Sequence, residues 1–275
     1  MSDFCDLCRQ EKKVQDSHLI PAALYRLARN NRPQKGLSPD PVLLSGKRAI
    51  QTSHQVKGSL LCPKCEDRFN KHGETIVIKQ CLRSNAGKFS LRDKLRVFSP
   101  HLGFDDSSWY SGARLPNTFR VDAYKYFAAS MFWRASAGKW SAPGALNWRN
   151  MLGSVYQEKF RQFLLSRVQF PKEAHLVIFV ANEEPSHWLL SPPSSSRKKG
   201  FHVHKFYIPG VEFRLFLGRQ IEPEILSLFA HFETDTIFVL DDFRTRPGFD
   251  NIVKWVKQSR QKGKLGAFYA KQRDS

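Results

Sequence analysis

Two C-x-x-C pairs, one near the start of the chain and one after a long insertion, constrain its fold more than any other feature. The pairs are Cys5 with Cys8 and Cys62 with Cys65. A two-residue gap lets both thiolates of a pair bind one face of a tetrahedral metal ion, so two pairs complete one structural site. The spacing therefore predicts a structural Zn²⁺ held by these four cysteines.

The alternative is that the thiols are simply buried or form two disulfides. Disulfides require an oxidising compartment, and Met1–Leu7 carries two aspartates and no apolar run of a secretory signal. We therefore expect a cytoplasmic, intracellular protein with reduced thiols. The fifth cysteine, Cys81, has no partner pair and is expected to be a small core residue.

The residues beside the cysteines form two further motifs. Asp16-Ser17-His18-Leu19-Ile20-Pro21 follows the first pair, and Leu61-Cys62-Pro63-Lys64-Cys65-Glu66 contains the second. Over about residues 5–74 this arrangement resembles the zinc-stabilised HNH endonucleases of the ββα-metal class. The resemblance implies a hairpin-plus-helix module with knuckles at its ends, and a catalytic divalent metal beside a general base.

The resemblance assigns roles to particular positions. His18 matches the general base. Ser17 stands where the first ligand of the catalytic metal is usual, Glu66 stands where a closing histidine is usual, and Lys57 falls near the family's orienting asparagine. The chain thus departs from the family at most catalytic positions.

Oxygen ligands near His18 nevertheless suit Mg²⁺ or Mn²⁺, because hard cations prefer oxygen. Asn70 lies four residues after Glu66, on the same helical face, and Asp16 points to the same side of an extended strand as His18. His18, Glu66, Asn70 and Asp16 form the predicted catalytic set. In the alternative interpretation, His18 is a packed residue bonded to the knuckle backbone.

The charge of the chain indicates a polyanionic partner. Its 275 residues include 44 Lys plus Arg against 25 Asp plus Glu, a formal net charge of +19. Such an excess favours nucleic acid, with DNA the first expectation, and predicts binding that weakens with salt. No apolar run approaches the ~18 residues of a membrane span, so we expect no membrane partner. A protein or ribonucleoprotein partner stays open.

Basic residues gather in three segments that lack hydrophobic periodicity and in the metal motif itself. Each segment is either a phosphate-contacting arm or a solvated connector. The candidate nucleic-acid-binding residues are Arg32, Lys35, Lys47, Arg48, Lys57, Arg197, Lys198, Lys199, Lys262 and Lys264.

Hydrophobic patterning predicts an α+β fold with a boundary near residue 100. Residues 1–100 are expected to form the zinc-knuckle HNH-like module with its basic insertion. Residues 101–275 are expected to form a helix pair and a mainly antiparallel sheet of about four strands, ending in a basic helix and tail. The predicted helices are 63–72, 118–137, 146–167, 221–232 and 248–261; the predicted strands are 175–182, 201–208, 211–218 and 236–240; 30–54, 84–116 and 191–200 are predicted to be irregular, and 76–82 to be a strand or buried segment.

Two residue pairs in the second half are candidate metal-binding or catalytic sites, but the sequence favours an ordinary structural role for both. His202 and His204 project from one face of a strand, and Asp241 and Asp242 follow another strand. Nothing in sequence places a third ligand nearby, so we expect a solvated strand face and a turn.

The function that the sequence favours is a metal-dependent HNH-like nuclease acting on DNA or, with less support, RNA. The resemblance implies a role in prokaryotic defence against invading DNA. One alternative is a non-catalytic, zinc-stabilised module that binds nucleic acid or a ribonucleoprotein. The other is a protein-docking subunit of a larger complex.

Overall fold

The computed structural model describes residues 3–12, 16–30, 42–45, 48–51, 55–81, 89–104, 106–140, 148–183, 189–246, 249–257 and 260–261. Its helices are α1 (Ala22–Asn30), α2 (Pro63–Phe69), a π-helical turn η1 (Asn70–Glu74), α3 (Thr75–Cys81), α4 (Ser90–Val97), α5 (Val121–Ala137), α6 (Gly153–Leu164), α7 (Pro223–His231) and α8 (Phe249–Lys257). Its strands are β1 (Ser17–His18), β2 (Val42–Ser45), β3 (Arg48–Gln51), β4 (Lys57–Gly58), β5 (Leu102–Phe104), β6 (Ser107–Ser111), β7 (Ala174–Ala181), β8 (Leu189–Arg197), β9 (Phe201–Ile208), β10 (Val211–Gly218), β11 (Thr236–Asp241) and β12 (Arg260–Gln261).

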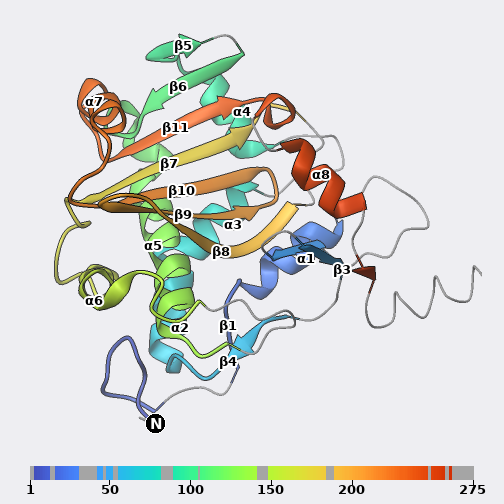
Figure 1. Ribbon diagram of the computed structural model, residues 1–275. Coiled ribbons are helices and arrows are strands. Elements are labelled where there is room, and N and C mark those ends of the chain that lie inside the picture. The colour runs from blue at the N-terminus through green and yellow to red at the C-terminus, as the bar shows by residue number, and fades with distance from the viewer. Residues whose placement is uncertain are drawn as a thin grey trace, which may run out of the picture.

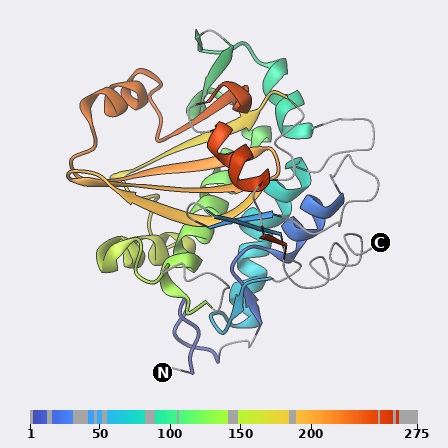
Figure 2. The same ribbon diagram turned by 45° about the vertical axis from the view of Figure 1, so that its right-hand side comes forward.

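A large twisted sheet divides the molecule into two layers of helices (Figure 1). The strand order is β12-β3-β2-β8-β9-β10-β7-β11-β6-β5, and most neighbouring strands are antiparallel. Helix α5 crosses one face, and α7 and α8 lie on the other face, as the turned view also shows (Figure 2). The predicted α+β class with a mainly antiparallel sheet is confirmed.

The predicted hairpin at the centre of the sheet is confirmed. Strands β9 and β10 pair from Ile208 opposite Val211, and Gly210 in the connection has φ +77°. That left-handed conformation suits glycine, which has no Cβ to clash. Phe206 and Phe213 lie opposite each other with stacked rings, 4.7 Å between centroids. Register and turn therefore agree, which fixes the face that each strand buries.

The sheet is larger than the four strands predicted, and three irregular predictions were wrong. The segment 30–54 contains β2 and β3, the segment 84–116 contains α4, β5 and β6, and 191–200 is largely β8. Strand β8 accommodates two prolines because its register shifts between Ser191 and Ser194, where no ladder donor is needed. The indole of Trp148 donates to the Pro193 carbonyl at 2.8 Å and holds this irregular stretch.

Helix α5 is buried on nearly every side, because its sequence is apolar around most of its circumference. It packs against the sheet through Phe127 and against α6, where the Tyr126 hydroxyl donates to the Leu164 carbonyl at 2.8 Å. The predicted helix pair is thus confirmed, although α6 is shorter than predicted. No helix among the described residues is long and apolar enough to cross a bilayer.

The cysteine-rich N-terminal segment packs on the C-terminal end of α5. One apolar core runs from Cys5 and Leu61 through Trp133 to the inner face of the sheet. The helix predicted for 63–72 forms as α2, passes through η1 and continues as α3, so residues 76–81, the described part of 76–82, are helical and not a strand. Gly73 allows this turn to touch α5, since an added Cβ would lie 3.0 Å from the Phe127 backbone. The prediction of separate units 1–100 and 101–275 stays a prediction.

Candidate metal centre and the adjoining polar site

The four predicted cysteines meet at one point. The Sγ atoms of Cys5, Cys8, Cys62 and Cys65 lie within 4.8 Å of one another, and those of Cys8 and Cys62 are 3.8 Å apart. Four sulfurs at ~2.3 Å from one tetrahedral ion are about 3.8 Å apart, whereas a disulfide requires ~2.05 Å. All five cysteines are free thiols. The group can therefore hold one metal ion, and the disulfide alternative does not hold.

Backbone hydrogen bonds shape both knuckles. The Arg9 N–H donates to the Cys5 carbonyl at 2.8 Å, and the Asp6 N–H donates to the Leu60 carbonyl at 3.0 Å. The Cys65 and Glu66 N–H groups both donate to the Cys62 carbonyl at 3.0 Å where α2 begins. These bonds join the two C-x-x-C pairs, far apart in sequence, into one preformed cluster.

One sulfur of the cluster is set up as an anion. A hydrogen bond with Cys65 is the main cause that lowers the pKa of the Cys5 thiol to about 4, and the same bond raises the pKa of Cys65. The lowered pKa favours the thiolate form of Cys5. Metal ions bind thiolates rather than thiols, so this charge favours a cation. Cys81 is fully buried, as predicted, and burial raises its pKa.

The candidate base His18 lies on a short two-stranded antiparallel sheet beside the cluster. Strand β1 pairs antiparallel with β4, with His18 opposite Lys57, and α2 follows β4. Ser17, at the family's metal-ligand position, is buried and accepts a hydrogen bond from the Leu61 N–H at 3.1 Å. Its hydroxyl therefore ties β1 to the second cysteine pair.

The surroundings of His18 keep its imidazole neutral. Burial is the main cause that lowers its pKa, and the charge of Lys57 acts in the same direction. Glu66 raises the pKa and Arg134 lowers it, so both charges act on the imidazole. A neutral imidazole at neutral pH can accept a proton.

A buried arginine that was not predicted links Glu66 to Glu74. The Arg134 guanidinium lies 2.5 Å from the Glu74 carboxylate and 3.5 Å from the Glu66 carboxylate, and it covers the ring of Phe69 at 4.7 Å. Its side chain is 2% exposed. We call Glu66, Glu74 and Arg134 the module cluster. An arginine inside the apolar stretch 127–135 was the sequence signal that pointed to a buried charge.

The module cluster is not fully satisfied. Among the described residues, neither Glu66 Oε1 nor Arg134 Nε, both buried, has a hydrogen-bond partner. Buried polar atoms normally have one, so the unpaired carboxylate oxygen and N–H are candidate contacts for an ion, a water or a ligand. The π-helical turn η1, which carries Glu74 back toward Arg134, is a kind of irregularity found often at functional sites.

The remaining predicted catalytic residues contact their own neighbours. Asp16 is exposed and lies 3.8 Å from the Lys57 ammonium, and Asn70 is exposed and accepts a hydrogen bond from the Thr75 hydroxyl at 2.8 Å. His72 is also exposed, with its ring 5.3 Å from that of Tyr126. The structure brings His18 and Glu66 within electrostatic reach of each other, whereas the roles of Asp16 and Asn70 stay predictions.

The predicted nucleic-acid contacts fall into three groups. Lys57 is exposed on β4, and the exposed Arg197, Lys198 and Lys199 end β8 and begin the turn to β9. Arg48 begins β3. Outside the described residues, for backbone or side chain, lie Arg32, Lys35, Lys47, the Arg48 side chain, Lys262 and Lys264.

The histidine pair on β9 differs from its prediction. His202 and His204 do project from one face with stacked rings, but that face is covered by Phe132 of α5 and His204 is 0% exposed. Burial lowers the pKa of His204 to about 3, and neither ring nitrogen has a described partner. The predicted solvated strand face was therefore wrong.

Comparison with known proteins gives no match for this chain. No protein-family model matches it, and no curated protein and no solved structure is significantly similar to it.

Proposed function

We propose that the chain is a zinc-stabilised, metal-dependent nuclease of the HNH type that cuts DNA. The observation that carries this proposal is the β1–β4–α2 arrangement beside four cysteines, with a neutral His18 on the first strand and an unpartnered Glu66 oxygen on the helix. Two short antiparallel strands followed by a helix are the elements that the ββα-metal resemblance implies.

The ion in the cysteine group is proposed to be Zn²⁺. Four thiolates in a closed, mostly buried tetrahedron suit zinc and leave no open position for a substrate, so this ion has a structural role. A catalytic cation requires a separate place with oxygen ligands, and Glu66 Oε1 offers one.

His18 and Glu66 supply complementary chemistry. His18, as a neutral imidazole, accepts the proton of the attacking water. Glu66 holds Mg²⁺ or Mn²⁺, which when bound neutralises charge on the scissile phosphate. The Lys57 side chain is exposed on β4, opposite His18 on β1, so it can bind an adjacent phosphate.

One observation favours a second candidate function, a non-catalytic module that binds nucleic acid. Arg134 already neutralises part of the Glu66 charge at 3.5 Å, where a catalytic cation would compete with it. In that case the hairpin and helix act as a scaffold, and binding rests on the basic surface.

A cleavage assay with plasmid and single-stranded DNA and RNA, in Mg²⁺ or Mn²⁺, separates the two. We expect His18→Ala and Glu66→Gln each to lower the rate by about 100-fold or more, because each removes a group that acts in the reaction. Matched controls are His72→Ala, an exposed histidine, and Asp67→Asn, the carboxylate next to Glu66 that pairs with Lys71. Zinc content is measured for every variant.

The nuclease proposal fails if the wild-type chain with its zinc binds DNA but cuts none of these substrates with either metal. It also fails if the control variants lose as much activity as the His18 and Glu66 variants.

A further inference from the structure

Cations from several separate segments lie at one end of the central strands of the large sheet, where β8 turns into β9 and β10 ends. The turn after β8 carries Lys199, and it lies beside the end of β10, because Phe201 pairs with Gly218 and a Cβ at Gly200 would meet Gln220. Arg219 follows directly. The Gly218 N–H donates to the Glu173 carbonyl at 3.2 Å, so the segment before β7 lies at the same end of the strands.

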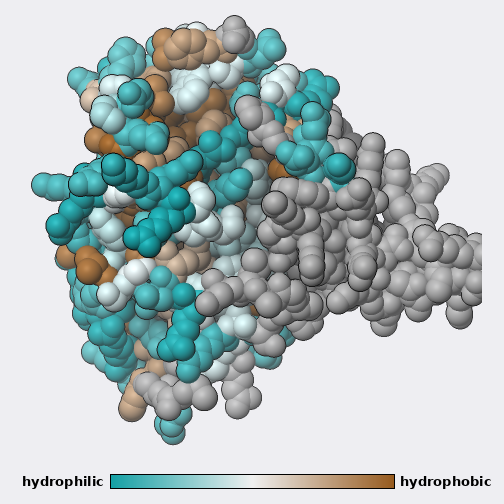
Figure 3. Space-filling view, in the orientation of Figure 1, coloured by the Kyte–Doolittle hydropathy of each residue, from teal (hydrophilic) through white to brown (hydrophobic). Residues whose placement is uncertain are grey.

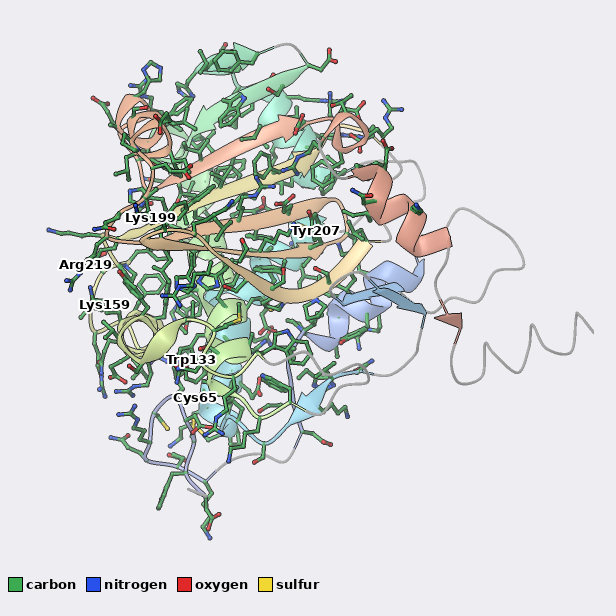
Figure 4. All side chains as sticks on the ribbon, viewed as in Figure 1. Cys65, Trp133, Lys159, Lys199, Tyr207 and Arg219 are labelled. Atoms are coloured by element: carbon green, nitrogen blue, oxygen red, sulfur yellow. The ribbon has the colours of Figure 1, made fainter. Side chains whose placement is uncertain are left out.

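Helix α6 lies between this end of the strands and the cysteine group. At one end of this group of cations, the Lys159 ammonium contacts the Glu173 carboxylate at 2.5 Å. At the other end Arg68 of α2 donates to the Ser166 hydroxyl at 3.3 Å, and Arg167 follows. We call this set the basic strip; its members are Arg68, Lys159, Arg167, Lys172, Lys199 and Arg219. Figure 4 shows Lys199, Arg219 and Lys159 along one side of the molecule, with Cys65 below them.

Most charges of the strip have no acidic partner. Arg167, Lys172, Lys199 and Arg219 are exposed and form no ion pair with a described residue. Some exposed cations elsewhere are paired, as Lys64 is with Glu11 and Lys71 with Asp67. Figure 3 shows hydrophilic residues gathered over this end of the strands, at the left of the view. Glu173 offsets part of the charge of Lys159 and Arg219. The remaining cations repel one another, so a bound polyanion would stabilise this surface.

The strip is attached to the proposed catalytic module rather than merely near it. Arg161 of α6 donates to the Leu7 carbonyl between the first two cysteines, at 2.5 Å, and Glu158 pairs with Arg9 at 2.9 Å. The 12 residues of α6 span about 18 Å, a length that corresponds to about five phosphates of one B-DNA strand at 3.4 Å each. The spacing between strip and module is therefore fixed by a rigid helix.

We propose that the basic strip binds the phosphate backbone of duplex DNA and holds it against the module that carries His18 and Glu66. This inference rests on the proposed function, because it assigns a binding surface to the same substrate. It adds Arg68, Lys159, Arg167, Lys172 and Arg219, which the sequence did not single out, to the predicted contact Lys199.

The test is duplex binding measured against salt concentration, by fluorescence anisotropy of a labelled 30-base-pair DNA without added Mg²⁺ or Mn²⁺. The strip variant is K172S/K199S/R219S. The control variant K79S/K94S/R120S removes three exposed cations, from α3, α4 and the residue before α5, that form no ion pair with a described residue, so both variants have the same net charge. His18→Ala is present throughout to prevent cutting.

We expect the strip variant to bind at least about tenfold more weakly. Its plot of log affinity against log salt should lose about 2.7 from its slope, since each phosphate contact contributes about 0.9. The control should stay within about twofold of the parent. Equal weakening of both triple variants, or no binding of duplex DNA by the parent, overturns the inference.

Failure of the strip and failure of the nuclease give different results. Strip-dependent binding by a wild-type chain that never cuts DNA would retain the strip and reject the nuclease. Metal-dependent cutting that K172S/K199S/R219S leaves unchanged would retain the nuclease and reject the strip as the DNA-binding surface.

Discussion

The module cluster and a second buried ion-pair group on the sheet use the same residue types with opposite outcomes. On the face of the sheet away from α5, Glu212 accepts from Arg214 at 2.6 Å on one oxygen and from Arg246 at 2.7 Å on the other. Arg246 also contacts Asp241 at 3.3 Å and covers the ring of Phe179 at 3.9 Å. We call Glu212, Arg214, Arg246 and Asp241 the sheet cluster. In the module cluster, by contrast, Glu66 keeps one buried oxygen without a partner.

The difference separates a structural charge group from a candidate site. Burial by itself would raise the pKa of Glu212, but Arg246 and Arg214 hold it below its ordinary value. That carboxylate has no capacity left for a ligand. The module cluster adjoins an imidazole and has an unpaired acceptor, so it has capacity for a cation. Satisfied hydrogen bonding, rather than burial, therefore tells the two apart.

The largest expected difference between the two regions follows metal removal. Structural zinc contributes about 10 kcal/mol or more to the folding of small zinc modules. Stripping the metal with a chelator should therefore expose the backbone amides of β1, β4 and α2 to hydrogen exchange while those of β7, β9 and β10 stay protected. Re-addition of Zn²⁺ is the control and should restore protection. Equal protection with and without metal would contradict a structural zinc.

The next largest effect is expected from the two glutamates. Glu212→Gln should lower the free energy of unfolding by about 3 kcal/mol, because it leaves the Arg214 guanidinium without its carboxylate partner and Arg246 with Asp241 alone. Glu66 is one-third exposed, so Glu66→Gln should cost about 1 kcal/mol or less. Urea unfolding monitored by circular dichroism measures both. A larger loss for Glu66 than for Glu212 would reverse the assignment of site and structure.

His204 provides a check on the meaning of unpartnered atoms. Its folded-state pKa of about 3 lies below the unfolded value of ~6.5, so the unfolded chain binds the proton first and stability falls as pH drops from about 6.5 to 3. At ~1.4 kcal/mol per pH unit, the loss over this range is on the order of 5 kcal/mol.

The variant His204→Phe removes that titration and should flatten the acid side of the stability profile. Urea unfolding at pH 7 and pH 4 measures it, with His72→Ala, an exposed histidine, as control. An unchanged pH profile in His204→Phe would mean that His204 has a partner in solution.

The smallest expected effect concerns competition between Arg134 and a cation. If Glu66 binds the catalytic metal, Arg134→Leu should strengthen Mn²⁺ activation of cleavage by about tenfold, because Glu66 no longer shares its charge. Titration of cleavage rate against Mn²⁺ measures this change. Weaker activation by Mn²⁺ would instead identify Arg134 as the group that positions Glu66. Arg214→Leu, in the sheet cluster, is the matched control and should leave Mn²⁺ activation unchanged.

Local patterns predicted the parts of the fold in which one segment carries its own signal. Alternating and continuous apolar runs placed β7, β9, β10 and β11, and 3.6-residue spacing placed α5. The same rules failed for β8, whose prolines and serines are typical of a loop, because β9 and β2 on its two sides supply the pairing. They also failed to extend the sheet to β2 and β3, where glycine, proline and basic residues hide the pattern.

The candidate site divides in the same way. Spacing alone identified the four cysteines, since two-residue gaps fix a tetrahedral grip, and the flanking residues identified His18 and Glu66. Arg134 and Glu74 were missed, because Arg134 reaches Glu66 and Glu74 only after α5 packs on η1.

The sequence by itself determined the cysteine cluster, the central strands, the long buried helix and the excess of positive charge, because each is written in neighbouring residues or in composition. Tertiary structure alone decided which charges are paired. It joined Glu66 to Arg134, paired Glu212 with two arginines, and left Arg167, Lys172, Lys199 and Arg219 of the basic strip without an ion pair to a described residue. The physical reason is that charge pairing depends on distances of a few ångströms between segments far apart in the chain, and only the packed core sets those distances.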